Sequence, residues 1–327
     1  MRMFLTFSPI FLMFACGDVK DTSSTGGSDS SGNDLPTCDI SVNATYPEDG
    51  STDHYYLDPI RFILSDPDGS AEVVTDIPGV QSTDAGGRTI VYTPDEPLAP
   101  NTSYTIGLDY CYGSPEIEFS TSSYGAPVDS DVQLEGKTFA LDLTSGDYTV
   151  GESAGELLNA LFTRHVMFQL DEIEGDELSV VVAVSKPNDS PIEQDLCGRT
   201  LSLDGVDISQ MPYFSLDLRE LVFGAHDGEL RFTQFSVNGT ISPDGSRIGG
   251  ISFVATMAVD EISHVLPDVG GVEALCQIAD NLGIPCAACP TDEFALCITV
   301  AAEHILAKDE DVTLQEVAEA GQADDCE

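Results

Sequence analysis

The sequence contains no tryptophan and very little positive charge. Only 12 lysine and arginine residues stand against 57 aspartate and glutamate residues, which gives a formal net charge of -45. Nucleic acids and anionic bilayer surfaces attract proteins through clustered lysine and arginine, so neither is expected as a partner. The lack of tryptophan weakens the case for a site that stacks sugar rings, although tyrosine and phenylalanine can substitute. The acidic residues are spread along the chain, and both a solvated acidic surface and a calcium-binding surface would explain them.

Catalytic and cofactor motifs are also missing. No GxSxG nucleophile elbow and no glycine-rich phosphate loop occur in the chain. No HExxH or other paired metal-ligand spacing involves the five histidines, which are His54, His165, His226, His264 and His304. We therefore predict no enzyme activity, catalytic residue, metal or cofactor. The alternative is an extracytoplasmic hydrolase whose dispersed histidine and carboxylates meet in a concave site of the second domain.

The N-terminal stretch carries the clearest signal in the chain. Arg2 precedes an apolar run from Phe4 to Ala15. This run is shorter than the roughly 20 apolar residues that a membrane-spanning helix needs, but it suits the core of a secretory signal peptide. We therefore predict a signal peptide over residues 1–15.

The residues around Cys16 resemble the lipobox of bacterial lipoproteins. Ala15 lies directly before Cys16, with Leu12 and Met13 upstream. The resemblance implies that Cys16 carries the lipid, palmitate included, and becomes the mature N-terminus; the alternative is an ordinary secreted protein with a stray cysteine. Gly17, where an aspartate would favour the inner membrane, favours the outer membrane. We expect a lipid-anchored protein of the cell envelope, partnered by the membrane through its anchor and by a surface protein or glycan.

Residues 16–36 form a flexible linker behind this anchor. Serine, glycine, aspartate and threonine dominate it, and it has no apolar periodicity. Such a segment cannot bury enough apolar surface to offset the entropy of ordering it. The linker therefore separates the anchor from two predicted domains, residues 37–123 and residues 132–327.

Residues 37–123 are predicted to form an antiparallel β-sandwich. Short segments rich in β-branched and aromatic residues are separated by glycine, proline and aspartate, with no helical period. The expected strands are Ile40–Tyr46, Pro59–Ser65, Ala71–Thr75, Arg88–Thr93, Ser103–Tyr110 and Glu116–Thr121. Asp66–Ser70 fits a β-turn, and more faintly a calcium loop that lacks the later acidic ligands.

The motifs of this domain resemble the bacterial Ig-like domains of cell-surface proteins. Tyr46–Gly50 and above all Leu98–Tyr104 carry the resemblance. It implies a spacer or adhesive module of seven strands, so a further strand is expected near Gly79–Ser82. It also implies a hydrogen bond between Tyr104 and the preceding loop. With seven strands, the sixth ends beside the start of the first, which predicts a Cys38–Cys111 disulfide.

Residues 132–327, after a hinge at residues 122–131, are predicted to form a larger antiparallel β-rich domain with a disulfide-stapled helical C-terminal part. The whole chain is thus expected to be mainly β. Alternating apolar residues indicate strands that curl into a sandwich or partial barrel, over Lys137–Leu143, His165–Ile173, Glu177–Ser185, Leu216–Phe223, Glu229–Ile241, Arg247–Val259 and Phe294–Ile305. Helical spacing indicates helices over residues 153–161, Glu261–Leu266, Val269–Leu282 and Thr313–Ala320.

The cysteine count agrees with export. Setting Cys16 aside leaves an even number of cysteines, which predicts up to four disulfides in an oxidising compartment. These candidates are Cys38, Cys111, Cys197, Cys276, Cys286, Cys289, Cys297 and Cys326. The six in the second domain allow 15 pairings. The four closest in sequence are expected to staple helix to strand, which leaves Cys197 and Cys326 as the remaining pair.

Cys286 and Cys289 form a C-x-x-C motif with two weaker readings. A zinc site would need a second pair at such spacing, and a redox site would need the motif at a helix N-terminus in a βαβ unit. Neither context is present, because Pro290 follows directly and no second pair occurs. Structural disulfides are the preferred interpretation.

The sequence therefore favours a structural, binding or adhesive role. A binding module should expose an apolar or aromatic patch, and the tetrapeptide Met211–Phe214 is the candidate. The simpler interpretation of that tetrapeptide is the entry into a strand.

Overall fold

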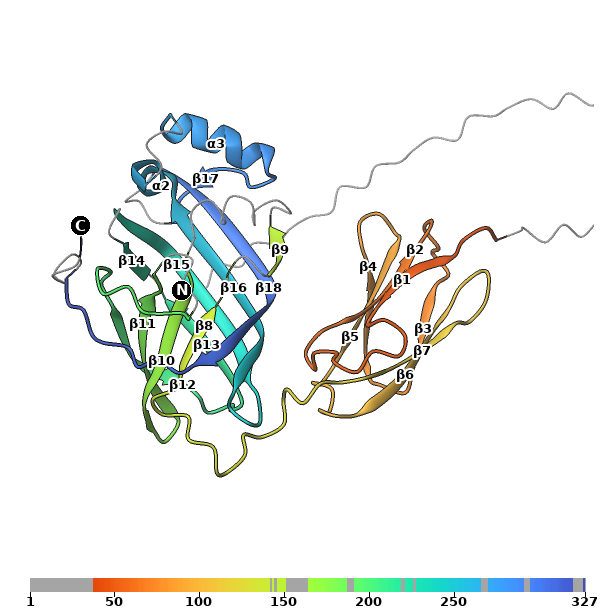
Figure 1. Cartoon of the computed structure of the whole chain (residues 1–327). Coiled ribbons are helices and arrows are strands. Elements are labelled where there is room, and N and C mark those ends of the chain that lie inside the picture. Colours follow the sequence, from red (N-terminus) through yellow and green to blue (C-terminus); the bar gives the residue numbers. More distant parts are fainter. Residues whose placement is uncertain are drawn as a thin grey trace, which may run out of the picture. The chain divides into compact units, whose positions relative to one another are not determined.

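The computed structural model describes residues 38–141, 143, 146–150, 164–186, 191–218, 221–225, 228–265, 270–290, 295–319 and 326. The chain divides into two compact units, Met1–Asp39 and Ile40–Glu327. All the described helices and strands lie in the second unit, which is mainly β and antiparallel (Figure 1). The predicted helix at residues 153–161 falls outside the described residues.

The N-terminal part of this unit contains two small sheets. One has four strands in the order β1-β2-β5-β4, formed by β1 (Val42–Tyr46), β2 (Ile60–Leu64), β4 (Gly79–Thr83) and β5 (Thr89–Pro94). The other has the order β3-β6-β7, formed by β3 (Glu72–Val74), β6 (Ser103–Asp109) and β7 (Glu116–Ser120). Both sheets bury alternate residues in one shared core, including Phe62, Ile90 and Phe119. The seventh strand expected near Gly79–Ser82 is present as β4.

Tyr104 makes the hydrogen bond that the sequence predicts. The backbone N–H of Ala99 donates to the Tyr104 hydroxyl at 2.8 Å. The ring of Tyr104 stacks on Phe119 with 5.8 Å between centroids. Cys38 and Cys111 both take part in disulfide bonds, and their pairing with each other stays a prediction.

The described strands after residue 137 form one sheet of 11 strands. Its main path runs β12-β11-β10-β8-β18-β16-β15-β13, while β14 pairs with β15, and β9 and β17 pair with β18. The strands are β8 (Thr138–Leu141), β9 (Asp147–Val150), β10 (Val166–Glu174), β11 (Glu177–Val184), β12 (Leu201–Asp207), β13 (Tyr213–Leu218), β14 (Leu221–Ala225), β15 (Gly228–Ile241), β16 (Arg247–Ala258), β17 (Ala287–Ala288) and β18 (Leu296–Glu310). The two end strands of the path, β12 and β13, are joined by residues 208–212 alone, so the sheet must curl on itself.

The inner face of this curled sheet carries the larger core. Strand alternation sends every second side chain inward, and the buried inward residues of the sheet form one apolar cluster that includes Phe139, Val180, Ile251 and Val300. Long strands β15, β16 and β18 supply much of it, as their alternating sequences predict. The predicted strand Leu216–Phe223 falls on β13 and β14, which pair with β15 in the same register, Leu218 opposite Phe235 and Leu221 opposite Phe232; residues 219–220 between them lie outside the described residues.

Among the described residues, two helices follow β16. They are α2 (Val259–Val265) and α3 (Val272–Asn281), close to two of the predicted helices. Disulfides Cys276–Cys286 and Cys289–Cys297 tie α3 to the segment before β17 and β17 to β18. Neither cysteine of the C-x-x-C motif is therefore a free thiol that can bind zinc. Within the described part of the chain, no helix has both the length and the apolar composition to cross a membrane.

The helix predicted over Thr313–Ala320 is wrong for residues 313–319, which are extended or bent. Their backbone N–H groups bond to side chains of β10 and of the segment between β11 and β12. The N–H of Leu314 donates to Gln169 at 2.8 Å and that of Gln315 to Gln194 at 2.7 Å. Leu314 is buried on the outer face of β10 and β11. These tertiary bonds override the local capping signal, and the disulfide Cys197–Cys326 fastens the end of this C-terminal strap.

The N-terminal sheets contact the curled sheet through tyrosines. The hydroxyls of Tyr55 and Tyr56 lie 2.6 Å and 3.2 Å from the Thr240 hydroxyl. Gly250 lies beneath the ring of Tyr55 in a left-handed conformation with φ of +57°, where an added Cβ would lie 2.0 Å from the ring. This close approach explains why glycine stands at that position in β16.

Candidate functional site

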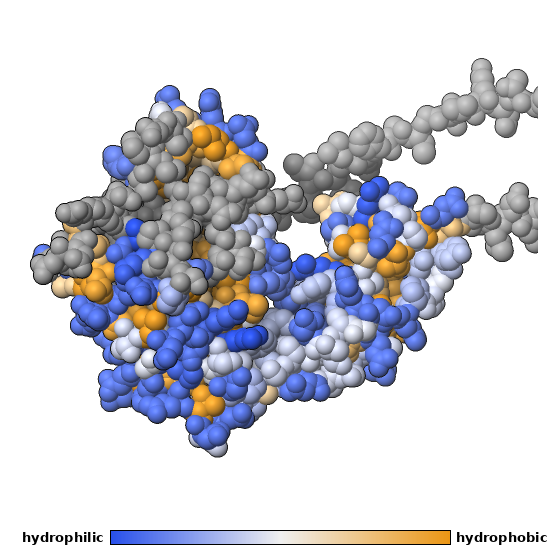
Figure 2. Space-filling view, viewed as in Figure 1, coloured by the Kyte–Doolittle hydropathy of each residue, from blue (hydrophilic) through white to orange (hydrophobic). Residues whose placement is uncertain are grey.

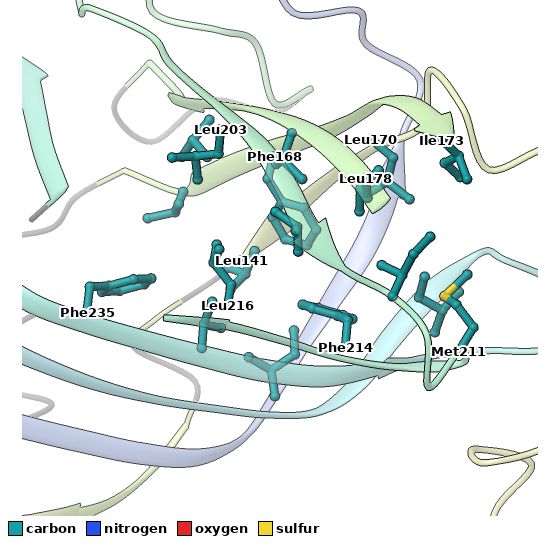
Figure 3. A pocket seen from close by; sticks show the side chains of 18 residues that line it. Leu141, Phe168, Leu170, Ile173, Leu178, Leu203, Met211, Phe214, Leu216 and Phe235 are labelled. Atoms are coloured by element: carbon teal, nitrogen blue, oxygen red, sulfur yellow. The ribbon is translucent and has the colours of Figure 1, made fainter. Parts of the chain in front are cut away.

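The curled sheet encloses a cavity of about 70 Å³. Such a volume holds several water-sized spheres, since one water needs about 10–15 Å³ in this measure. All 18 lining residues are apolar: Leu141, Val166, Phe168, Leu170, Ile173, Leu178, Val180, Val182, Leu203, Val206, Ile208, Met211, Phe214, Leu216, Phe235, Val237, Ile241 and Ile251 (Figure 3). Water entering this space would find no polar side chain to bond, so the cavity suits an apolar occupant.

Strand alternation builds the wall formed by β10 and β11. Val166, Phe168 and Leu170 point to one face of β10, and Leu178, Val180 and Val182 to one face of β11. The strands pair so that Phe168 lies opposite Val182 and Leu170 opposite Val180. These are the faces that the alternating sequence predicts. What the pattern does not show is that this face borders an open space.

Two bulges then keep charge out of the cavity. Along β10 the alternation would place Glu172 inward after Leu170, but the register shifts between these two residues. The extra residue changes the phase of the strand, so that Ile173 lines the cavity and Glu172 is exposed. In β12, which pairs with β11, a second shift separates Leu203 from Val206. Gly205 accommodates it with φ of +73°.

The cavity borders a seam in the sheet. The end strands β12 and β13 are consecutive in the chain, yet no ladder joins them among the described residues. Leu203 of β12 and Phe214 and Leu216 of β13 line the cavity and remain partly exposed. Figure 3 shows Leu203 and Leu216 reaching the hollow from different strands. The seam thus places apolar side chains beside two strand edges that no ladder joins among the described residues.

The tetrapeptide Met211–Phe214 does not form the exposed patch that a binding module would present. Pro212 is buried, and the other three residues are half-buried. Met211 and Phe214 line the cavity, and β13 begins at Tyr213. The simpler interpretation, a strand entry, describes its backbone, while two of its side chains belong to the cavity wall.

A second cluster gathers a histidine and carboxylates, as the hydrolase alternative requires. The ring nitrogens of His304 lie 2.9 Å from Asp58 (Nε2) and 2.9 Å from Asp147 (Nδ1). The Tyr46 hydroxyl donates to the same Asp58 oxygen at 2.8 Å. His304 occupies a left-handed position in β18 with φ of +60°, which is uncommon for a residue other than glycine.

The electrostatics of this cluster favour an ion pair over general base catalysis. Hydrogen bonding to Asp58, and then to Asp147, raises the pKa of His304 to about 9. The imidazole is therefore protonated near pH 7, and a protonated ring cannot accept a proton from a nucleophile. Burial raises the pKa of Tyr46, so its hydroxyl stays a neutral donor.

His54 packs beside this cluster as a neutral ring. It is 3% exposed, and its edge meets Tyr46 and Phe119 with ring centroids 5.5 Å and 5.0 Å apart. Burial lowers the pKa of His54. Neither ring nitrogen has a hydrogen-bond partner among the described residues. In that same part of the chain, no group of three or more histidine, cysteine or acidic side chains is placed to hold a metal ion.

Comparison with known proteins adds no family to this picture. No protein-family model and no curated protein matches the chain. Function must therefore be argued from the cavity and its surroundings.

The cavity residues that sequence reasoning missed lie mainly on β12. Leu201 and Leu203 alternate, but the bulge at Asp204–Gly205 breaks the period of two before Val206 and Ile208. One sequence signal does indicate this strand. Two short runs of alternating apolar residues are separated by a glycine, which is typical of a bulged strand.

Proposed function

We propose that this chain is a lipid-anchored protein of the cell envelope, placed in the outer membrane through Cys16, and that its larger domain binds the hydrocarbon chain of an apolar or amphiphilic ligand. The observation that carries the proposal is the cavity, whose 18 lining side chains are all apolar. An anchored protein would meet such ligands at the membrane to which it is attached.

The cavity supports binding over catalysis. Its lining offers no acid, base or nucleophile to a bound molecule, and the protonated His304 is held by two carboxylates elsewhere. A non-enzymatic binding role therefore accounts for the described residues better than the hydrolase alternative does.

The driving force for such binding is burial of methylene groups. Each buried methylene contributes about 0.8 kcal/mol, so a segment of about six would supply about 5 kcal/mol before the costs of immobilising the chain. A cavity of this volume therefore fits a slender chain in part and gives modest affinity. Repacking of Met211, which has a flexible side chain, would extend the available space.

We further propose that residues 37–123 form a bacterial Ig-like domain that serves as a spacer. The strand orders β1-β2-β5-β4 and β3-β6-β7 support this assignment, because the constant-type immunoglobulin sandwich has the same two orders. The Tyr104 hydrogen bond adds to it.

The absence of tryptophan provides a direct binding test. Phe235→Trp places a single indole in the cavity wall, and Tyr112→Trp places one on a side chain that is 75% exposed. Titration with N-phenyl-1-naphthylamine should give saturable energy transfer in the Phe235→Trp protein and little in the Tyr112→Trp control. Equal transfer in both proteins, or none in either, would contradict the proposal.

A cavity-filling pair of variants checks the location. Val237→Phe adds bulk to a lining residue, whereas Val74→Phe adds it to an exposed strand residue of the N-terminal part. We expect about tenfold weaker naphthylamine binding in the first variant and no change in the second, at equal thermal stability.

The anchor has its own test. In a bacterial host, the native chain should partition with membranes at the mass of a lipidated protein starting at Cys16, and Cys16→Ser should not. Soluble, unlipidated material from both chains would refute the anchor without touching the cavity.

A further inference from the structure

We propose that the outer face of the curled sheet carries a binding groove for an extended peptide, and that its partner is the C-terminal strap (residues 313–319) of a second copy of this chain. In the structure the groove holds the strap of its own chain. Figure 1 shows the strap as the dark blue segment that leaves β18 and crosses the sheet. This inference goes beyond the proposed binding function, and it depends neither on the cavity nor on the anchor.

The groove contacts the backbone of the strap. The side-chain amide of Gln194 accepts a hydrogen bond from the N–H of Gln315 at 2.7 Å and donates one to the carbonyl of Gln315 at 2.8 Å. At Val317, the hydroxyl of Thr200 accepts from the N–H at 2.9 Å, and the N–H of Thr200 donates to the carbonyl at 3.0 Å. Residues two apart in an extended segment direct their backbone groups to the same side. The groove therefore binds the strap in the way that a sheet edge binds an added strand.

One buried leucine anchors the strap. Leu314 is 7% exposed, and its N–H donates to Gln169, whose side chain is also buried. Its neighbours Thr313 and Gln315 are exposed. The buried residues around Leu314 are apolar: Ala140, Met167, Val181 and Ala183. The groove thus fits an extended segment with a single apolar anchor.

A second copy supplies the same segment. The groove residues that bond the strap lie 117 to 145 positions before the strap residues that they contact. The strap follows β18, and no strand ladder includes it among the described residues. Its contacts can therefore form in trans without a new interface. Exchange of an identical element between two copies is a low-cost route to a dimer.

The charge of the chain favours contact through a narrow strap over contact through a broad face. With a formal net charge of -45, the bodies of two copies repel each other. Figure 2 shows the face in view as largely hydrophilic with separate hydrophobic patches. An exchanged strap joins two copies through a few residues. Because salt screens the repulsion between the bodies, exchange should increase with ionic strength.

The disulfide Cys197–Cys326 decides where the strap is held. Within one chain it joins cysteines 129 positions apart. In an exchanged dimer, the Cys326 thiol of one copy and the Cys197 thiol of the other would form the same bond. The two thiols lose two protons and two electrons, which a disulfide oxidant such as oxidised glutathione accepts as it becomes two thiols. The new bond then fixes the strap in trans.

Two complementary variants detect the exchange. The donor chain carries Cys197→Ser and keeps Cys326, whereas the acceptor chain carries Cys326→Ser and keeps Cys197. Both are full length and carry Cys16→Ser, and neither can form this disulfide alone. At about 100 µM of each chain, against an effective concentration of about 1 mM for the strap in cis, about a tenth of the grooves should hold the partner strap. In glutathione buffer we expect a disulfide-linked heterodimer, measured by non-reducing electrophoresis and intact mass.

One substitution should act in opposite directions in the two chains. Leu314→Ala in the donor removes the anchor of the exchanging strap and should slow heterodimer formation at least about tenfold. The same change in the acceptor weakens the competing resident strap and should speed heterodimer formation about fivefold. Thr313→Ala, at an exposed position, should change neither rate. A fall in the rate with both Leu314→Ala chains, or no change with either, would overturn the proposal.

A second pair of donor variants tests recognition of the backbone. Gln315→Pro removes the N–H that bonds Gln194, whereas Gln315→Ala keeps it and changes an exposed side chain. We expect heterodimer formation to slow about fivefold with the proline and to stay unchanged with the alanine. Equal rates for the two variants would show that the groove does not bind the strap through its backbone.

The donor chain alone measures random collision. Its Cys326 thiols can join two donors without any groove, and this homodimer should form more slowly than the heterodimer. Equal rates of homodimer and heterodimer formation, or a heterodimer yield that falls from 20 mM to 0.5 M salt, would contradict strap exchange. None of these results bears on the cavity or the anchor, whose tests use other residues and other measurements.

Discussion

Replacing His304 with glutamine should make the protein less stable at neutral pH but not at alkaline pH. The pKa of His304 rises from 6.5 to about 9 on folding, chiefly through the hydrogen bond to Asp58. Each pKa unit corresponds to about 1.36 kcal/mol, which sets an upper value of about 3 kcal/mol. Because His304 is 26% exposed and Asp147 is 78% exposed, solvent screening reduces this to about 2 kcal/mol.

The sign of the effect follows from the direction of the shift. A raised pKa in the folded state means that the stabilisation is fully present below pH 6.5 and is lost as the pH rises through about 9. Urea unfolding, followed by far-UV circular dichroism between pH 6 and 9.5, would measure it. The difference in unfolding free energy between the native chain and His304→Gln should fall steadily across that range.

A matched control uses another histidine. His264→Gln changes an exposed side chain at the end of α2, and its effect on the unfolding free energy should be small. The groups that face His304 are Asp58, Asp147, Tyr46 and the neutral His54. A difference for His304→Gln that stays constant from pH 6 to 9.5 would show that His304 packs there without its charge contributing.

Two further changes test the packing of the unit Ile40–Glu327. Gly250→Ala would place a Cβ 2.0 Å from the Tyr55 ring and should cost more than about 3 kcal/mol of unfolding free energy. Gly175→Ala, at a similar φ of +65° with open space around it, should cost only about 1 kcal/mol; equal losses in thermal melts would mean that Tyr55 yields easily. Removing the Cys197–Cys326 disulfide with two serines opens a loop of 129 residues, which predicts a loss of about 4–5 kcal/mol. An unchanged melting temperature would mean that the C-terminal strap holds without its disulfide.

Much of the strand content could be predicted from local patterns. The N-terminal strands other than β4 follow from alternation and turn residues, which act over a few positions, whereas only the resemblance to Ig-like domains predicts a strand near Gly79–Ser82. The strands β10, β11, β15 and β16 were found for the same reason. Local signals failed where tertiary bonds compete: the N–H of Leu314 donates to Gln169 of β10, and that of Gln315 to Gln194 in the segment between β11 and β12, in place of the bonds of a helix.

The cavity could not be predicted from the sequence. The sequence pattern of an inward-facing valine is the same whether its side chain packs against another side chain or borders an empty space. Val180 and Val237 therefore do not indicate a cavity. The inward position of Ile173 depends on a one-residue bulge in β10. Strict alternation along the strand would place Ile173 outward. The cluster around His304 unites residues more than 150 positions apart, and only the folded chain brings them together.

The place of β18 in the sheet has a consequence for how the protein folds. This strand comes near the end of the chain, yet it lies between β8 and β16 and joins the two halves of the sheet. Until β18 has arrived, the wall strands β10 to β12 and the long strands β15 and β16 have no shared ladder. Sheets built from such distant pairings fold slowly. A chain that crosses a membrane from its N-terminus would thus stay open, with no cavity formed, until nearly all of it had been delivered.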